Sequence, residues 1–249
     1  MTFKARLRAG EMMVGAFIKT PHPTVVEVLS RSDLDCLVLD AEHAPFGREA
    51  IDLCTLAARA GGKAVLVRPQ SAAPEHLLNA LDCGATGVLA PHIRSADEAR
   101  ALVKACQYGP GGRGFAGSSR AAHYTGKPMV RHLADSAQET TVVAQIEDVE
   151  AVEAIEEIAH VDGIDALFVG RADLTIALGC DNPDDPRVID AVERVCAAGQ
   201  TVGRTVGMFL SRTSDAPYWR AKGARFFVLS SDHGFLLAGA NALARDAKA

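Results

Sequence analysis

The sequence has little of what marks the more specialised classes of protein. Aromatic residues make up 5% of the 249 residues, there is a single tryptophan, and the formal net charge is −5. A net negative charge repels phosphate backbones and anionic lipid, so we expect neither nucleic acid nor a membrane surface as a partner. No uncharged apolar run approaches the roughly 18 residues that would span a bilayer.

Paired cysteines and a leader segment are also missing from the pattern. The six cysteines are scattered, without a Cys-x-x-Cys pair or a zinc-type cluster. Such thiols are typical of small buried side chains in a reducing compartment. The basic start of the chain reaches Gly10 and Glu11 before any apolar stretch long enough for a signal peptide. These features predict a cytoplasmic protein.

What the sequence does contain is a regular alternation of two kinds of segment. Short apolar runs rich in β-branched residues occupy residues 14–18, 36–39, 64–67, 86–90, 141–146, 166–169, 206–210 and 226–229. Runs without polar alternation favour strands buried on both faces, as in parallel sheets. Segments with helical spacing lie between them, at 48–60, 95–107, from 149, at 188–198 and at 235–244. Eight such strands predict one closed (β/α)8 barrel domain over residues 1–249, because a doubly wound sheet would use fewer.

One segment, at about 108–140, is longer than most connections and breaks this alternation. We predict an additional helix at 127–137 within it, and a role in a subunit contact or in shaping the site. The segment from Gly112 to Gly117 matches G-x-G-x-x-G. A dinucleotide fingerprint must follow a strand and open a helix, whereas this one follows a predicted helix, so we reject it as a cofactor loop.

Polar residues that follow the predicted strands are the candidate functional groups, because barrel enzymes place their chemistry at the carboxyl ends of strands. Glu147 and Asp173 follow neighbouring strands and offer oxygen ligands that suit an octahedral divalent cation. They are not accompanied by the His and Cys ligands that zinc usually takes. Paired carboxylates are equally common as solvated surface groups, so both interpretations stand at this point.

An acid/base group and an anion-binding group are expected at the same end of the barrel. His43 lies three residues after Asp40, whose carboxylate could hold the imidazole, and Asp82 is a second candidate for that role. The alternative is an ordinary exposed loop histidine. Arg68 ends an apolar strand, so we expect its guanidinium inside the barrel mouth, where it would bind an anion or a developing oxyanion.

Five ordered motifs carry a resemblance to a known family. They are Asp40-x-Glu-His43, Arg68-Pro69, Leu81-Asp82-x-Gly-Ala, Gln145-Ile-Glu147 and Gly170-x-Ala-Asp173-Leu. In this order and at these separations they resemble the metal-dependent (class II) pyruvate aldolases, which include the 4-hydroxy-2-oxoheptanedioate and 2-keto-3-deoxyglucarate aldolases. The resemblance runs from about Gly15 to Asp232. It implies a (β/α)8 barrel, a divalent cation such as Mg²⁺, Mn²⁺ or Co²⁺, pyruvate with an aldehyde as substrates, and a hexamer built from two trimers.

The resemblance also implies a role for each matching residue. Glu147 and Asp173 would be the metal ligands. Gln145, with the backbone around Ala172 and Asp173, would hold the pyruvyl carboxylate. Arg68 would contact the keto oxygen, and His43, supported by Asp40 and Asp82, would be the acid/base. Arg171 stands where family members commonly have proline, so we expect an additional charge beside the metal loop.

Three other functions are compatible with the same barrel. An acyl-CoA lyase of the citramalyl- or malyl-CoA type would share the metal pair, but the low aromatic content offers little adenine-stacking surface. A Schiff-base aldolase needs a lysine projecting into the barrel, for which Lys19 is the candidate, since Lys63 begins its strand at the opposite end. A barrel that only binds a small acid is the third, because fold does not dictate function.

Overall fold

The computed structural model describes residues 1–249, and its eight strands form a closed parallel barrel in sequence order. The strands are β1 (Met13–Ile18), β2 (Cys36–Asp40), β3 (Ala64–Arg68), β4 (Gly87–Ala90), β5 (Thr141–Ile146), β6 (Ala166–Val169), β7 (Thr205–Leu210) and β8 (Phe226–Ser231). Pairing of β8 with β1 closes the barrel. The predicted (β/α)8 fold is confirmed, because continuous apolar runs indicated strands that the barrel buries on both faces.

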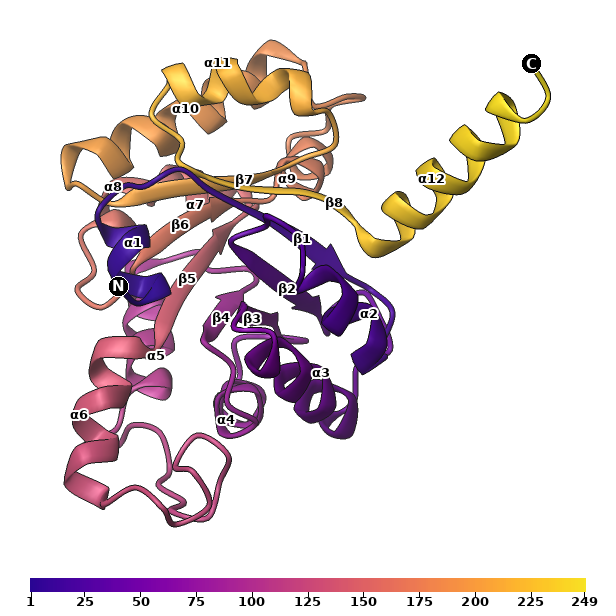
Figure 1. The fold of residues 1–249 in the computed structure, drawn as a ribbon. Coiled ribbons are helices and arrows are strands. Elements are labelled where there is room, and N and C mark those ends of the chain that lie inside the picture. Colours follow the sequence, from indigo (N-terminus) through magenta and orange to yellow (C-terminus); the bar gives the residue numbers. More distant parts are fainter.

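Helices connect successive strands and cover the outside of the barrel, except the first helix, which precedes β1, and the last helix, which extends away from the barrel (Figure 1). They are α1 (Phe3–Arg8), α2 (Pro23–Leu29), α3 (Arg48–Ala60), α4 (Pro74–Asp82), α5 (Ala96–Cys106), α6 (Met129–Glu139), α7 (Val149–Glu153), α8 (Ile155–Ala159), α9 (Arg171–Ala177), α10 (Pro186–Thr201), α11 (Ala216–Ala221) and α12 (Asp232–Asp246), with a short 3-10 helix η1 (Thr213–Asp215) before α11. None of these helices combines the length and the apolar character needed to cross a bilayer.

Local sequence explains where several helices begin and end. Ser95 caps α5, its side chain accepting a hydrogen bond from the backbone of Glu98. Helix α3 ends at Ala60 and is capped by Gly61, and Gly62 follows with φ +68°, a conformation that favours glycine. The additional helix predicted at 127–137 is α6. The helix predicted from residue 149 is divided at Ala154 into α7 and α8, a break that the helical spacing did not indicate.

The segment between α5 and α6 contains no strand beyond one isolated bridge between Tyr108 and Arg113. The G-x-G-x-x-G match lies here and opens no helix. Three consecutive residues further on, at 123–125, adopt left-handed backbone angles with φ between 51° and 71°. The segment is therefore a series of tight turns rather than a phosphate-binding loop.

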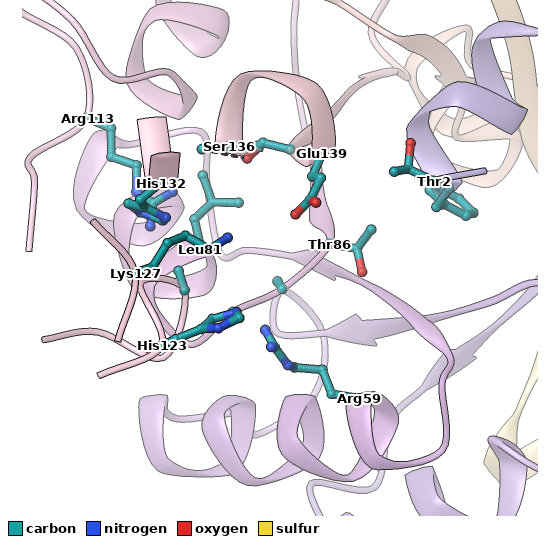
Figure 2. Close-up of a pocket in the computed structure, with 15 residues that line it drawn as sticks. Thr2, Arg59, Leu81, Thr86, Arg113, His123, Lys127, His132, Ser136 and Glu139 are labelled. Atoms are coloured by element: carbon teal, nitrogen blue, oxygen red, sulfur yellow. Dashed lines mark hydrogen bonds between the residues drawn. The ribbon is translucent and has the colours of Figure 1, made fainter. Parts of the chain in front are cut away.

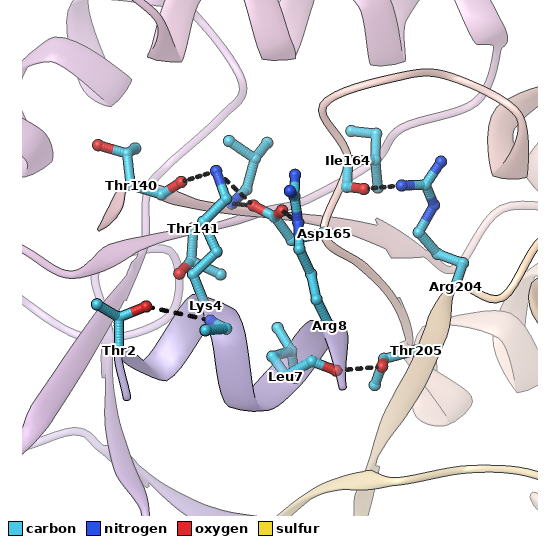
Figure 3. Close-up of polar contacts among 12 residues, drawn as sticks. Thr2, Lys4, Leu7, Arg8, Thr140, Thr141, Ile164, Asp165, Arg204 and Thr205 are labelled. Carbon is cyan, nitrogen blue, oxygen red and sulfur yellow. Dashed lines mark hydrogen bonds and ion pairs between the residues drawn. The ribbon is translucent and has the colours of Figure 1, made fainter. Parts of the chain in front are cut away.

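The amino-terminal end of the barrel is closed by α1 (Figure 3). Lys4 Nζ donates to the carbonyl of Thr140 at 2.8 Å and lies 3.5 Å from Asp165. Arg8 Nε lies 2.6 Å from Asp165 Oδ1, and Asp165 as a whole is only 1% exposed. The same carboxylate accepts the backbone N–H of Val142. This closure leaves the carboxyl ends of the strands as the open side of the barrel.

We predict that Asp165→Asn destabilises the fold, because it leaves the buried Lys4 ammonium without its counter-charge. Breaking a buried ion pair from one side costs about 3–5 kcal/mol. Urea unfolding followed by circular dichroism measures the loss. The control is Asp162→Asn at a nearby exposed position, which we expect to change stability by less than about 0.5 kcal/mol. Equal stability of the two variants would contradict a stabilising role for this cluster.

Candidate functional site

A cavity of about 410 Å³ opens at the carboxyl ends of the strands, and we call it the mouth. It is lined by Phe17, Lys19, His43, Arg68, Gln145, Phe168, Gly170, Arg171, Ala172, Asp173, Phe209, Ser211, Ser230 and Ser231. The lining contains five residues that the sequence predicts for the site, which come from the ends of β3, β5 and β6 and from the loop after β2. The parallel barrel therefore brings together residues that are more than 100 positions apart in the chain.

Asp40, the last residue of β2, organises one side of the mouth. Its fully buried carboxylate accepts hydrogen bonds from Lys19 Nζ at 2.8 Å, from Arg68 Nε at 3.0 Å and from the backbone N–H of His43 at 3.2 Å. Burial alone would raise the pKa of Asp40, but the charge of Arg68 and the bonds from Lys19 and His43 hold that pKa below its usual value. Asp40 is therefore an anion that positions three of its neighbours.

Within one chain, neither Asp40 nor Asp82 contacts the His43 imidazole. Asp40 bonds to the main chain of His43 and not to its ring, and the ring is 53% exposed, with Nε2 3.6 Å from Glu42 Oε2. Asp82 does not reach His43 in this chain, because α4 carries it away from the mouth to a pairing with Arg113. The order of the motifs identifies Asp82 in the sequence. Its position in space is set by the direction of α4, of which it is the last residue.

Arg68 lies inside the mouth, as predicted from its place at the end of an apolar strand. Its side chain is 8% exposed, and its guanidinium lies 4.5 Å from the centre of the Phe17 ring. Its Nε is also 3.3 Å from Glu42 Oε2. The Phe17 ring and the carboxylates hold the Arg68 guanidinium in one orientation, and the guanidinium still lines the cavity.

Glu147 does not line the mouth itself, but it lies against Gln145 and Gly170, which do. Its side chain is 2% exposed, and Gln145 Nε2 donates to Glu147 Oε2. A Cβ at Gly170 would lie 2.5 Å from the same oxygen, so only glycine allows the chain to pass this carboxylate closely. Burial raises the pKa of Glu147, and the negative charge of Asp173 acts in the same direction.

Two residues that had no assigned role converge on Glu147. One ligand atom from each of Glu42, His92 and Glu147 lies within 4.8 Å of the other two. Glu42 follows β2 inside the first motif, and His92 follows β4, so their places after strands were the available signal. Neither could be assigned from that alone, because polar residues after strands also face solvent.

The donor groups fit a divalent cation. Glu42 Oε2 is buried and accepts no hydrogen bond, and burial raises the pKa of Glu42 even though Arg68 is close. Buried carboxylates with raised pKa values lack sufficient positive charge around them, which a divalent cation would supply. Asp173 lines the same mouth, and its charge acts on both Glu42 and Glu147, but it is not one of the three side chains that converge within 4.8 Å.

Two other cationic side chains of the mouth are already engaged. Arg171 donates to the carbonyl of Pro183 at 2.9 Å, and its guanidinium lies 5.1 Å from the centre of the Trp219 ring. The charge expected beside the metal loop is therefore directed toward α10 and α11. Lys19 Nζ lies 2.8 Å from the buried Asp40, and this contact engages the nitrogen that a Schiff-base mechanism would need free.

A second cavity, of about 240 Å³, lies between α1, α4, α6 and the segment before α6 (Figure 2). Arg59, Arg113 and Lys127 contribute cationic side chains to it, together with the imidazoles of His123 and His132. None of the residues predicted for the site lines this cavity. The mouth is therefore the candidate functional site.

Comparison with known proteins agrees with this geometry. The family described as HpcH/HpaI aldolase/citrate lyase matches residues 13–238. A 4-hydroxy-2-oxo-heptane-1,7-dioate aldolase from Salmonella typhimurium is 34% identical over 245 residues, which cover 97% of this chain and 92% of the relative.

Two solved structures give the same result. An HpcH/HpaI aldolase/citrate lyase family protein from Burkholderia cenocepacia is 32% identical, with a TM-score of 0.93 and coverage of 99% of this chain and 98% of that chain. An HpcH/HpaI aldolase from Desulfitobacterium hafniense is 29% identical, with a TM-score of 0.92 and coverage of 100% and 97%. The resemblance to pyruvate aldolases is confirmed, and the chain belongs to the HpcH/HpaI aldolase/citrate lyase family.

Proposed function

We propose that this protein is a divalent-cation-dependent aldolase, a carbon–carbon lyase that reversibly cleaves 4-hydroxy-2-oxo acids to pyruvate and an aldehyde within a single barrel domain. The observation that carries the proposal is that Arg68, His43 and Gln145 line one open cavity and contact the carboxylates of Glu42 and Glu147 directly beside it. The grouping supplies a cation site, a fixed positive charge and an acid/base at one place. The aldolase from Salmonella typhimurium supports the same substrate class.

We assign the cation to Glu147 and Asp173, with Mg²⁺, Mn²⁺ or Co²⁺ as the ion. Three observations support this assignment: Glu147 is buried, Asp173 lines the mouth, and the negative charge of Asp173 raises the pKa of Glu147. A bound divalent cation would act as a Lewis acid that withdraws electron density from the 2-oxo acid. Gly170 supports this role, because its missing Cβ leaves room for the Glu147 carboxylate.

The substrate would be held on both sides of that site. Arg68 would donate to the 2-oxo oxygen, where negative charge grows as the carbon–carbon bond breaks. Gln145 would bind the pyruvyl carboxylate together with the backbone N–H groups at Ala172 and Asp173. Gln145 is 1% exposed and is already oriented by its bond to Glu147, so little side-chain freedom would be lost on binding.

His43 would move the proton. In the cleavage direction, its imidazole accepts the proton of the C4 hydroxyl, the C3–C4 bond breaks, and the bonding electrons pass through C3 and C2 to the 2-oxo oxygen. The aldehyde leaves, C3 of the pyruvate enolate takes a proton from water to give pyruvate, and the His43 imidazolium releases its proton to the solvent. The exposed ring of His43 at the rim suits this exchange, while the Asp40 bond to the His43 backbone holds its position.

We further propose a cytoplasmic location. All six cysteines are free, and five of them are buried. Unpaired thiols in this number are typical of proteins in a reducing compartment.

Removal of the acid/base gives the most direct test of the mechanism. We predict that His43→Ala lowers kcat by about 10²–10⁴-fold, the usual contribution of a positioned proton-transfer group, and leaves cation affinity within about threefold. Pyruvate release from a 4-hydroxy-2-oxo acid, coupled to lactate dehydrogenase, measures the rate. The control is His233→Ala, whose ring contacts Thr20 outside this machinery, and we expect it to keep near-normal activity.

Two outcomes would contradict the assignment. Full activity of His43→Ala would remove the proposed proton transfer. Cleavage of a malyl-CoA-type thioester in place of any 4-hydroxy-2-oxo acid would instead favour the acyl-CoA lyase.

The cation requirement is tested by chelation and by one added methyl group. We expect chelation to abolish pyruvate release and Mg²⁺, Mn²⁺ or Co²⁺ to restore it. Gly170→Ala should weaken Mn²⁺ binding by about 10–100-fold, because the new Cβ displaces the carboxylate of Glu147. Gly47→Ala, which has open space for its Cβ, is the matched control for calorimetric titration. Unchanged Mn²⁺ affinity in Gly170→Ala would argue against Glu147 as a ligand.

We also propose self-association, as the hexamer of two trimers that the resemblance implies. Helix α12 extends from its own barrel (Figure 1), and Leu236, Leu237 and Leu243 on it are 66%, 64% and 73% exposed. Exposed leucines on such a helix are suited to packing against another copy. Sedimentation equilibrium should give six times the chain mass, and Leu236→Glu with Leu237→Glu should lower it. A monomer at micromolar concentration would contradict the assembly.

A further inference from the structure

His92 has a backbone conformation and a hydrogen bond that direct it toward the cation site. It follows β4 with φ +54°, in the left-handed region that residues other than glycine adopt infrequently. Its backbone N–H donates to Glu147 Oε1 at 3.0 Å. The uncommon backbone conformation is thus tied to the carboxylate proposed as a metal ligand. Backbone outliers of this kind gather at functional sites.

The His92 imidazole is held between carboxylates on its two sides. Nδ1 lies 3.0 Å from Asp148 Oδ2 and 3.4 Å from Glu147 Oε1, while Nε2 lies 3.8 Å from Glu42 Oε1. Asp148 is in turn 3.2 Å from Arg94 Nε, which fixes its carboxylate. A histidine that binds a metal through one ring nitrogen usually gives its other N–H to a carboxylate, and that bond selects the tautomer. Asp148 is placed to do this for His92.

We propose that His92 Nε2 is a third protein ligand of the cation, with Glu42 completing the same side of the site. The inference rests on the proposed function, because it requires a cation at Glu147. The convergence of Glu42, His92 and Glu147 within 4.8 Å carries it, together with the buried Oε2 of Glu42, which accepts no hydrogen bond. Atoms bound to one ion at about 2.0–2.2 Å lie at most about 4.4 Å apart. The three side chains would therefore need to move only slightly to bind one ion together.

The proposal changes the expected choice of metal. Mg²⁺ prefers oxygen ligands and keeps its water, whereas an imidazole nitrogen favours Mn²⁺ and, more strongly, Co²⁺ and Zn²⁺. A site of carboxylates alone would accept Mg²⁺ readily. The nitrogen ligand therefore makes His92 the residue that determines specificity for transition metals over Mg²⁺.

The test compares the full-length wild-type protein with His92→Asn. Asparagine tolerates the left-handed conformation and retains the backbone N–H to Glu147, but its side chain is too short to replace Nε2. We expect Co²⁺ affinity to fall by about 10–100-fold in the variant, and Mg²⁺ affinity by less than about threefold. Calorimetric titration of each metal alone measures both. His233→Asn is the control for loss of a histidine at the rim, and we expect it to change neither affinity.

Pulsed electron paramagnetic resonance of the Mn²⁺-loaded protein identifies the ligand directly. We expect a nitrogen coupling of directly bound imidazole in the wild-type protein, its replacement by the ¹⁵N pattern after ¹⁵N-histidine labelling, and its absence in His92→Asn. A Mn²⁺ signal without that coupling would overturn the proposal.

A parallel assay of pyruvate release separates the two inferences. Metal-dependent pyruvate release without nitrogen coupling would leave the aldolase standing and remove His92 as a ligand. Nitrogen coupling without release of pyruvate from any 4-hydroxy-2-oxo acid would keep the ligand and remove the aldolase. Failure of the wild-type protein to bind Mn²⁺ or Co²⁺ would overturn the His92 proposal together with the cation site on which it rests.

Discussion

The burial of Glu147 and Glu42 at the barrel mouth is the constraint on which the rest of the site depends. Withdrawing carboxylates from water is costly unless positive charge or hydrogen bonds replace the solvent. Part of the lost solvation is replaced by Arg68, by the Gln145 amide and by the His92 backbone N–H. The pKa values of Glu147 and Glu42 nevertheless remain raised. A divalent cation would supply the missing charge, and that same charge is what a carbon–carbon cleavage needs at an adjacent oxygen.

The two ends of the barrel have different roles: the amino-terminal end stabilises the fold, and the carboxyl end carries the candidate site. At the amino-terminal end, Asp165 is satisfied by Lys4, by Arg8 and by a backbone N–H, so its polar groups are fully used within the chain. At the carboxyl end, Glu42 Oε2 and Gln145 Oε1 are buried without a hydrogen-bond partner. Buried groups left unpaired in this way are expected where a ligand completes the bonding. The distinction agrees with the general placement of active sites on this fold.

The fold was predictable because its signals are local. Continuous apolar runs mark strands buried on both faces, and the Gly61–Gly62 pair and Ser95 mark helix ends. The break at Ala154 and the departure of α12 from the barrel were not predictable, because both depend on what packs against the helix.

Sequence position was sufficient to predict Arg68, Gln145 and Asp173 as residues of the mouth, since parallel strands end at the same edge. Within one chain, Asp82 pairs with Arg113 and not with the ring of His43, and motif order contains no information on the direction of a side chain. Glu42 and His92 needed burial and distance before they could be distinguished from ordinary loop residues.

Cleavage in this mechanism depends on a divalent cation bound by Glu147 and Asp173. The decisive measurement is anomalous X-ray diffraction from crystals soaked in Mn²⁺ and a pyruvate analogue. We expect one strong anomalous peak within bonding distance of the Glu147 and Asp173 carboxylates, with the analogue between that peak and Arg68. A peak elsewhere, or an analogue bound in the mouth with Glu147 and Asp173 turned away from any ion, would contradict it.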